Sequence, residues 1–311
     1  MAELGAIRTT QMPESSRSLL DQALAVAARQ PSPNTRRAYT STYRSFCAFL
    51  DVGHQNPRIE DLTSGAVQAY CDFLERQGRS QATIARHLSA LRSLAEELGL
   101  DPTIQEEVKV ERPSSQQPSS LAEDEYEALL SAPDTRIARG KRDLAILRLL
   151  GDCGLRRSEL CAVQWQDIEH VADCLAAQTL LLEPEQRTSY ELVVRKAEGE
   201  QMRRVPLTRG SLEALFAWRG AQPVASGQHV FASTRKASAP LSDRMVANVV
   251  RAHAEEAGLP EHCCSPHALR HTFCARLARN GASPQQIAEL AGHIDMRTAK
   301  LYAEGSALSV A

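Results

Sequence analysis

The sequence reads Pro266-His267-Ala268-Leu269-Arg270-His271 in its last third and continues to Gly292-His293 and then to Tyr302. A helix turns once in about 3.6 residues, so His267, Arg270 and His271 share one face of it. The apolar residues that follow fall on the opposite face and can anchor the helix in a core. Two imidazoles and a guanidinium that point the same way suit an anion, above all a phosphate. Tyr302 is then a candidate nucleophile.

The bulk properties fit a protein of two domains. The chain has 311 residues, of which 43% are hydrophobic, so it can build sizeable cores. It contains no apolar run that could cross a bilayer and no signal-peptide core, so we expect a cytoplasmic protein without a membrane partner. The net charge of −2 does not by itself indicate a nucleic-acid partner. A basic groove can nevertheless be present if acidic residues on another face of the protein balance it.

The eight cysteines include no CxxC pair, and we expect reduced, buried thiols rather than disulfides. A zinc site could be drawn from His267, His271, Cys263 and Cys264. The pattern lacks the glutamate of a His-Glu-x-x-His motif, and adjacent cysteines are not spaced as paired ligands. We therefore expect no metal ion.

Helical patterns fill the first third of the chain. Residues 1–20 are expected to form a tail or a short leading helix, and residues 21–110 a compact helical bundle. Its helices are expected from Asn34, from Thr63 to about Gln77, and from Ser80 to about Gly99. Four arginines near the third helix either contact DNA or form a solvated face: Arg76, Arg79, Arg86 and Arg92.

A polar segment with two prolines, residues 111–120, is typical of a linker. The remainder, residues 121–311, is expected to form a mainly α domain with a small antiparallel β-sheet. Strands are expected at Thr179–Leu182, Glu191–Val194 and Arg203–Leu207. Helical patterns include Leu144–Leu150, Ser242–Ala257, Ser265–Asn280 and Ser283–Ala291.

Further motifs accompany the opening stretch. Gly154-Leu155-Arg156-Arg157-Ser158-Glu159-Leu160 follows an apolar helix, and Lys196 stands at the end of an expected strand. The first motif resembles the first arginine box of the tyrosine recombinases of the phage integrase family, and His267–Phe273 matches the second box almost letter for letter. The interval from His293 to Tyr302, 302 − 293 = 9, reproduces the family's spacing. The N-terminal bundle is similar to the family's core-binding domain.

This resemblance implies a mechanism on DNA. Tyr302 would attack the scissile phosphate and form a 3′-phosphotyrosyl link that frees a 5′-hydroxyl. Arg156 and Arg270 would clamp the non-bridging oxygens and stabilise the transition state. The link stores the phosphodiester energy, so no ATP is required, and the fixed cations would do what a metal ion could otherwise do. No cofactor is expected. The implied function is a site-specific recombinase that integrates, excises or resolves DNA.

The resemblance also implies proton donors and acceptors. His267 would assist proton transfer near the tyrosine, and His293 would donate a hydrogen bond to the phosphate. Lys196 would protonate the leaving 5′-oxygen. The hairpin lacks the family's lysine-rich glycine turn, which leaves Arg195 as an alternative to Lys196.

Neighbouring residues are expected to support the site. Glu159 would orient Arg156, His271 would line the site or the core, and Arg157 would contact the DNA backbone. The family's Thr-His after the tyrosine is replaced by Ala303-Glu304, and 311 − 302 = 9 residues remain. A contact with a neighbouring subunit through this tail is therefore in question.

The implied partner is double-stranded DNA with paired inverted-repeat sites, enclosed by both domains within a homotetramer, with or without accessory proteins. In a bacterial cell such a protein would lie with the nucleoid. Two other functions stay open at this point. A non-catalytic DNA-binding protein with this fold would bind DNA in a salt-dependent way without a covalent adduct. A topoisomerase would relax supercoils without a site-specific product.

Overall fold

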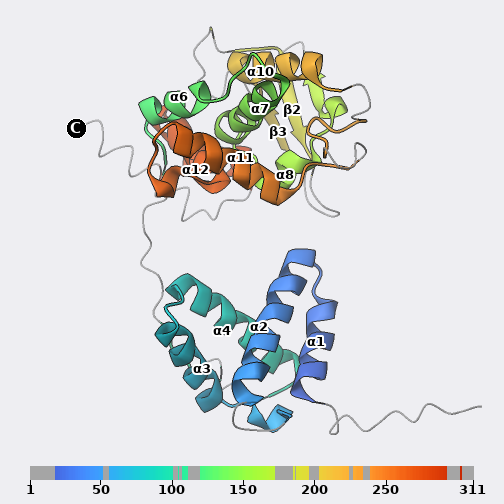
Figure 1. Ribbon diagram of the computed structural model, residues 1–311, viewed down its shortest axis with the longest axis vertical. Coiled ribbons are helices and arrows are strands. Elements are labelled where there is room, and N and C mark those ends of the chain that lie inside the picture. Colours follow the sequence, from blue (N-terminus) through green and yellow to red (C-terminus); the bar gives the residue numbers. More distant parts are fainter. Residues whose placement is uncertain are drawn as a thin grey trace, which may run out of the picture. The chain divides into compact units, whose positions relative to one another are not determined.

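The computed structural model describes residues 18–51, 56–100, 104, 107–110, 120–171, 185, 187–195, 203–223, 227–233, 239–292 and 302. The chain forms two compact units, Met1–Ser115 and Gln116–Ala311 (Figure 1). Both are mainly helical, and the second contains a small antiparallel sheet, which confirms the predicted fold class. Within the described ranges, no helix combines the length and the apolar character that a bilayer span requires.

The first unit is built from the helices α1 (Leu19–Arg29), α2 (Pro33–Asp51), α3 (Ser64–Arg76) and α4 (Gln81–Glu97), with a short 3₁₀ turn before α3. The Thr63 and Ser80 hydroxyls cap α3 and α4, because each accepts an otherwise unpaired N–H of the first turn, and both residues stand where the sequence predicts these helices to begin. The expected start at Asn34 is one residue late, since α2 already begins at Pro33. Proline is well suited to a first helical turn, where its missing N–H costs nothing.

The sheet of the second unit contains β1 (Ile168–His170), β2 (Tyr190–Val194) and β3 (Arg203–Pro206) in the order β1-β2-β3. Leu192 of β2 lies opposite Ile168 of β1 and Val205 of β3, so apolar residues meet on one face. The predicted strands at 191–194 and 203–207 are confirmed to within a residue. β1 was not predicted, because a strand of three residues carries too little alternation to be recognised. The predicted strand 179–182 lies outside the described residues.

The helices of the second unit surround α7 (Ala138–Asp152), which is buried along most of its length and packs against α10 and α12. Figure 1 shows α7 in the middle of this unit. The other helices are α6 (Glu123–Ser131), α8 (Arg157–Ala162), α10 (Arg209–Ala221), α11 (Asp243–Glu256), α12 (Pro266–Arg279) and α13 (Pro284–Ala291). From Ala145 to Asp152 every residue of α7 except Arg148 is buried, and this part of the helix provides the support on which α12 is fixed.

Candidate active site

Helix α12 supports the candidate site. The Ser265 hydroxyl accepts the N–H of Ala268, and Pro266 occupies the first turn. The side chains of the predicted cationic face differ in burial. Arg270 is only 6% exposed, whereas His267 is exposed and His271 lies between these extremes. Arg270 therefore lies on the buried side of the helix, and its long side chain extends from there toward the site.

The Arg270 guanidinium is held by backbone carbonyls. Its two terminal nitrogens donate to the carbonyl oxygens of Gly154 and Ala291. Burial, followed by the charge of Arg156, lowers the pKa of Arg270 to about 10, so this side chain stays charged at neutral pH. Gly154 has φ +60°, and a Cβ there would lie 2.2 Å from Cδ1 of Phe273. A glycine is thus needed where the chain leaves α7 and presents its carbonyl to Arg270.

Arg156 stands immediately before α8. Its Nη1 donates to Oε1 of Glu159 at 2.8 Å, and its backbone N–H donates to Oε2 at 2.7 Å. Its Nη2 donates to the carbonyl of Gly292, which also lies 3.5 Å from Nη2 of Arg270. The two arginines that the sequence selected, more than a hundred residues apart, therefore meet at one carbonyl oxygen.

Sequence reasoning did not select Arg203, which completes this arrangement from β3. Both terminal nitrogens of Arg203 donate to Glu159 at 2.8 Å, and its Nε donates to the carbonyl of Leu290 at 2.8 Å. Burial favours the neutral form of the Glu159 carboxyl, but Arg203, aided by Arg156, outweighs it and lowers the pKa of Glu159 to about 2. The signal in the sequence was the alternation of the strand, which turns Arg203 and Val205 inward and Arg204 outward.

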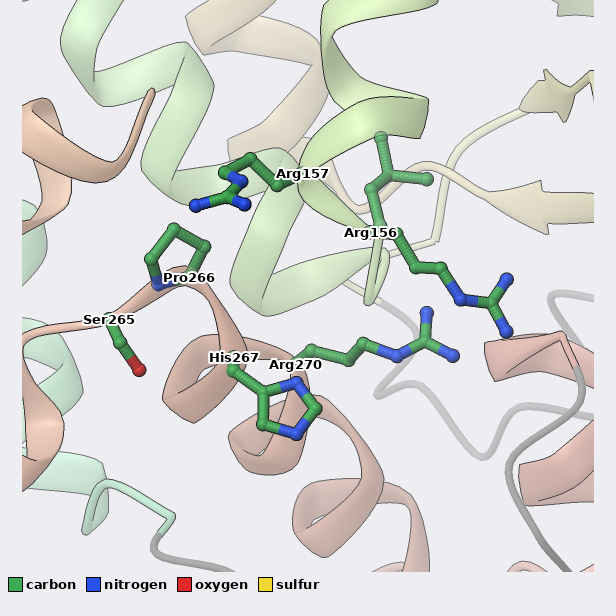
Figure 2. A pocket seen from close by; sticks show the side chains of 7 residues that line it. Arg156, Arg157, Ser265, Pro266, His267 and Arg270 are labelled. Atoms are coloured by element: carbon green, nitrogen blue, oxygen red, sulfur yellow. The ribbon is translucent and has the colours of Figure 1, made fainter. Parts of the chain in front are cut away.

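A pocket of about 330 Å³ opens beside these groups. It is lined by Leu155, Arg156, Arg157, Ser265, Pro266, His267 and Arg270. Figure 2 shows Arg156 and Arg270 extended in the same direction, with His267 beside them and Arg157 turned to the other side. Arg157 pairs with Asp243 of α11 at 3.5 Å. The pocket is thus cationic and open to solvent, which suits a phosphate group.

Tyr302 contacts the second of the two histidines. Its hydroxyl and Nδ1 of His271 form a hydrogen bond, and the ring centroids are 5.8 Å apart. The ring of His271 in turn contacts that of His267 edge to face, with centroids 4.1 Å apart. A continuous row of rings thus connects the tyrosine hydroxyl to the pocket.

Two of the predicted site residues, Lys196 and His293, lie outside the described residues. Arg195, the alternative to Lys196, is described, and its Nε donates to Oδ1 of Asp167 at 2.5 Å. This pair ties Arg195 to the 3₁₀ turn before β1.

The DNA-binding candidates of the first unit fall into two groups. Arg76, Arg79 and Arg86 are exposed. Arg92 is half-buried and donates to the carbonyls of Ile104 and Val108, at 3.5 and 2.7 Å, so it fixes the segment that follows α4. Arg76 also donates to a carbonyl, that of Asp72 at 3.3 Å, but this bond stays within its own helix.

The alternative of a zinc site can be compared with the geometry. Across the part of the chain that the structure describes, no three His, Cys, Asp or Glu side chains gather into a group that could hold a metal ion. Cys263 is a buried free thiol, and the thiol of Cys264 is directed to the carbonyls of Leu259 and Pro260. His271 is directed to Tyr302.

Comparison with known families places both units. Residues 119–307 match the model of the phage integrase family, and residues 23–99 match that of the phage integrase N-terminal SAM-like domain. Tyrosine recombinase XerD of Listeria monocytogenes serotype 4b (strain F2365) is 27% identical over 288 residues, which cover 89% of this chain and 90% of the relative. Tyrosine recombinase XerC of Syntrophus aciditrophicus (strain SB) is 29% identical over 293 residues, with 88% of each covered.

Solved structures share the fold. The XerH site-specific recombinase bound to a palindromic difH substrate superposes with a TM-score of 0.68 at 19% identity and covers 94% of this chain and 82% of that one. A lambda integrase dimer bound to a COC′ core site gives a TM-score of 0.63 at 21% identity, with 91% and 75% covered.

Proposed function

The chain belongs to the phage integrase family of tyrosine recombinases, and from this premise we propose that Tyr302 is the nucleophile with which it cleaves and rejoins DNA. The protein is a site-specific DNA recombinase that works by the tyrosine mechanism.

One observation carries the assignment. Arg156 and Arg270 meet at the Gly292 carbonyl beside an open pocket, and the row His267–His271–Tyr302 leads from that pocket to a hydroxyl group. Two guanidiniums on one phosphate offset the negative charge that grows on its oxygens as the fifth bond to phosphorus forms. Because they are fixed by carbonyls and by Glu159 beforehand, little reorganisation is needed in the transition state.

The remaining roles follow the family pattern. His293 would donate a hydrogen bond to the phosphate, and Lys196 would protonate the 5′-oxygen as it leaves. Glu159 positions Arg156, because it accepts both the side-chain and the backbone N–H of that residue. His267, which lines the pocket, is a further group in reach of a bound phosphate.

The proposal extends to the partner. The substrate is duplex DNA, and the relatives named XerH and lambda integrase, which are seen with DNA sites, support this. We further propose that residues 21–110 form the core-binding domain, 111–120 the linker and 121–311 the catalytic domain. The separation of the units between Ser115 and Gln116 is in keeping with this division. A homotetramer on paired inverted repeats, and a place on the nucleoid, belong to the same proposal.

A covalent trap tests the nucleophile. The protein is incubated with a library of nicked duplexes with randomised sequence, denatured, and the DNA that stays attached is sequenced. The attached peptide is identified by mass spectrometry. We expect the adduct on Tyr302, its loss in Tyr302→Phe and its survival in the matched control Tyr190→Phe. An adduct of normal yield in Tyr302→Phe would refute the assignment.

The same preparation separates the other functions. A non-catalytic DNA-binding protein gives salt-dependent binding and no adduct with any member of the library. A topoisomerase relaxes a plasmid that carries the recovered site but produces no recombinant between two copies of it. The recombinase that we propose produces both the adduct and the recombinant.

A further inference from the structure

The hydroxyl of Tyr302 is in contact with the second histidine of α12, not with the first. Nδ1 of His271 forms a hydrogen bond with this hydroxyl, and the two rings lie 5.8 Å apart at 39°. His267, to which the resemblance assigns proton transfer near the tyrosine, stands on the pocket side of His271 and touches its ring edge to face. The geometry therefore separates two tasks that the sequence attributes to a single histidine.

A phenol becomes an effective nucleophile only as its proton leaves, and the base has to be within hydrogen-bonding distance of that proton. Building on the proposed role of Tyr302, we infer that His271 is the residue that accepts the phenolic proton when Tyr302 attacks phosphorus. With its own proton on Nε2, the neutral imidazole presents the Nδ1 lone pair to the phenol.

The surroundings of His271 set when this base works. Burial, followed by the charges of His267 and Arg270, lowers the pKa of His271 to about 4. The ring is therefore neutral at neutral pH, and its lone pair is available. A phosphate bound at Arg270 adds a negative charge, which offsets the guanidinium and raises the basicity of the imidazole. The base thus gains strength when the substrate arrives.

The O–H bond of Tyr302 breaks and an N–H bond forms at Nδ1 of His271, while the phenolic oxygen bonds to phosphorus. The bond from phosphorus to the 5′-oxygen breaks, and that oxygen takes its proton from a different group, for which Lys196 is proposed above. In the rejoining step, the imidazolium returns its proton to the departing Tyr302.

The test measures single-turnover adduct formation on a nicked duplex that carries the sequence recovered from the trapped library. His271→Ala is expected to slow the adduct by about a hundredfold to a thousandfold, the usual contribution of a proton-transfer group. His271→Asn keeps an acceptor atom near the place of Nδ1 but is not basic, so it is expected to stay slow. A near-normal rate in either variant overturns the inference. His262→Ala, which removes an exposed histidine just before α12, is the matched control and should keep the normal rate.

The pH profile separates a base from a merely structural side chain. Without an internal base, the phenolate must form in solution, so the variant rate should rise about tenfold for each pH unit near neutrality. The rate of the original protein should be nearly level there. Parallel profiles would overturn the inference. Urea unfolding and DNA affinity show whether each variant is folded. If His271→Ala is unfolded, the test is made with His271→Asn alone.

The outcome is distinct from that of the proposed function. An adduct that persists in Tyr302→Phe removes the nucleophile and this inference with it. An adduct that is lost in Tyr302→Phe but forms at the normal rate in His271→Ala leaves the nucleophile in place and removes only the role of His271.

Discussion

The pair between Glu159 and Arg203 provides the sharpest test of how the site is held. Both side chains are 8% exposed, and two hydrogen bonds of 2.8 Å join them. The pKa of Glu159 lies at about 2 against an ordinary 4.5, and this difference corresponds to about 3 kcal/mol of stability. Removal of one partner from a buried pair costs about 3–5 kcal/mol, because the other charge stays buried. Glu159→Gln should therefore destabilise the second unit by about 3 kcal/mol.

The assay is urea unfolding of the full chain, with a probe for each of its two units because they need not unfold together. Trp165 and Trp218 both belong to the second unit and supply its fluorescence signal. Glu169→Gln is the matched control. Its partner Arg204 lies on the same strand as Arg203 and at the same 2.8 Å, but the pair is exposed, so the unfolding midpoint should hardly change. A loss in Glu159→Gln no larger than in this control would refute the reasoning.

The same pair predicts a pH dependence. A carboxyl whose pKa is lowered by folding contributes stability above its unfolded pKa, and this contribution is lost as the pH falls toward the folded value. For Glu159 the window runs from about 4.5 down to about 2. The contribution should fall by about 0.8 kcal/mol at pH 4 and by about 2 kcal/mol at pH 3. The stability difference between the original protein and Glu159→Gln should shrink accordingly, and a constant difference would contradict the assignment.

Three further changes test other parts of the structure. Gly154→Ala should lower the free energy of unfolding in urea by at least about 1 kcal/mol more than Gly258→Ala does. Both glycines have positive φ, but only a Cβ at residue 154 would meet the Phe273 ring. Arg270→Lys should keep DNA affinity nearly unchanged in a binding assay yet slow adduct formation by about two to three orders of magnitude, since one fixed phosphate donor is lost; a normal rate would contradict its role. Arg86→Ala should lower the slope of log K against log salt for DNA binding by about one released counterion. Arg92→Ala should mainly destabilise the first unit, by about 1–3 kcal/mol, because two carbonyls lose their donor. If the two arginine variants show the same change in salt dependence, the distinction between an exposed and a structural arginine is wrong.

Much of the fold could be predicted from the sequence, because residues close to a helix end determine where that helix begins. Thr63, Ser80, Ser265 and Ser283 each cap the helix that was expected to follow them. α1 lies almost wholly within the expected bundle, residues 21–110, but no helix was expected there before Asn34. α10 was not predicted either, since its apolar residues are mixed with small or exposed ones that blur the period. β1 depends on its pairing with β2, which no local pattern can reveal.

The site residues could be predicted from the sequence only where residue type and spacing indicate their chemical role. Arg156, Arg270 and Tyr302 could be selected in this way. For Arg203 the alternation of the strand indicates only an inward side chain, because its importance comes from a contact with Glu159, 44 residues earlier in the chain. The different contacts of His267 and His271 were also hidden, since both share one face of the helix and only the position of Tyr302 distinguishes them.

The end of α13 explains how a site with this much positive charge is stable. Three guanidiniums lie close together here, and their mutual repulsion opposes folding. The last carbonyls of the segment accept from all three arginines: Leu290 from Arg203, Ala291 from Arg270, and Gly292 from Arg156 and, at 3.5 Å, from Arg270. A helix C-terminus carries partial negative charge, which favours cations.

These carbonyls and Glu159 do not neutralise the site completely. One carboxylate is shared by Arg156 and Arg203, so the cluster keeps a net positive charge that a phosphate can balance. Gly292 sets the limit of the arrangement, because it has φ +68° and a Cβ on it would lie 2.8 Å from Nη1 of Arg203. The glycine of the Gly292-His293 motif is therefore required by packing against Arg203, and this requirement holds whatever the neighbouring histidine contributes to the chemistry.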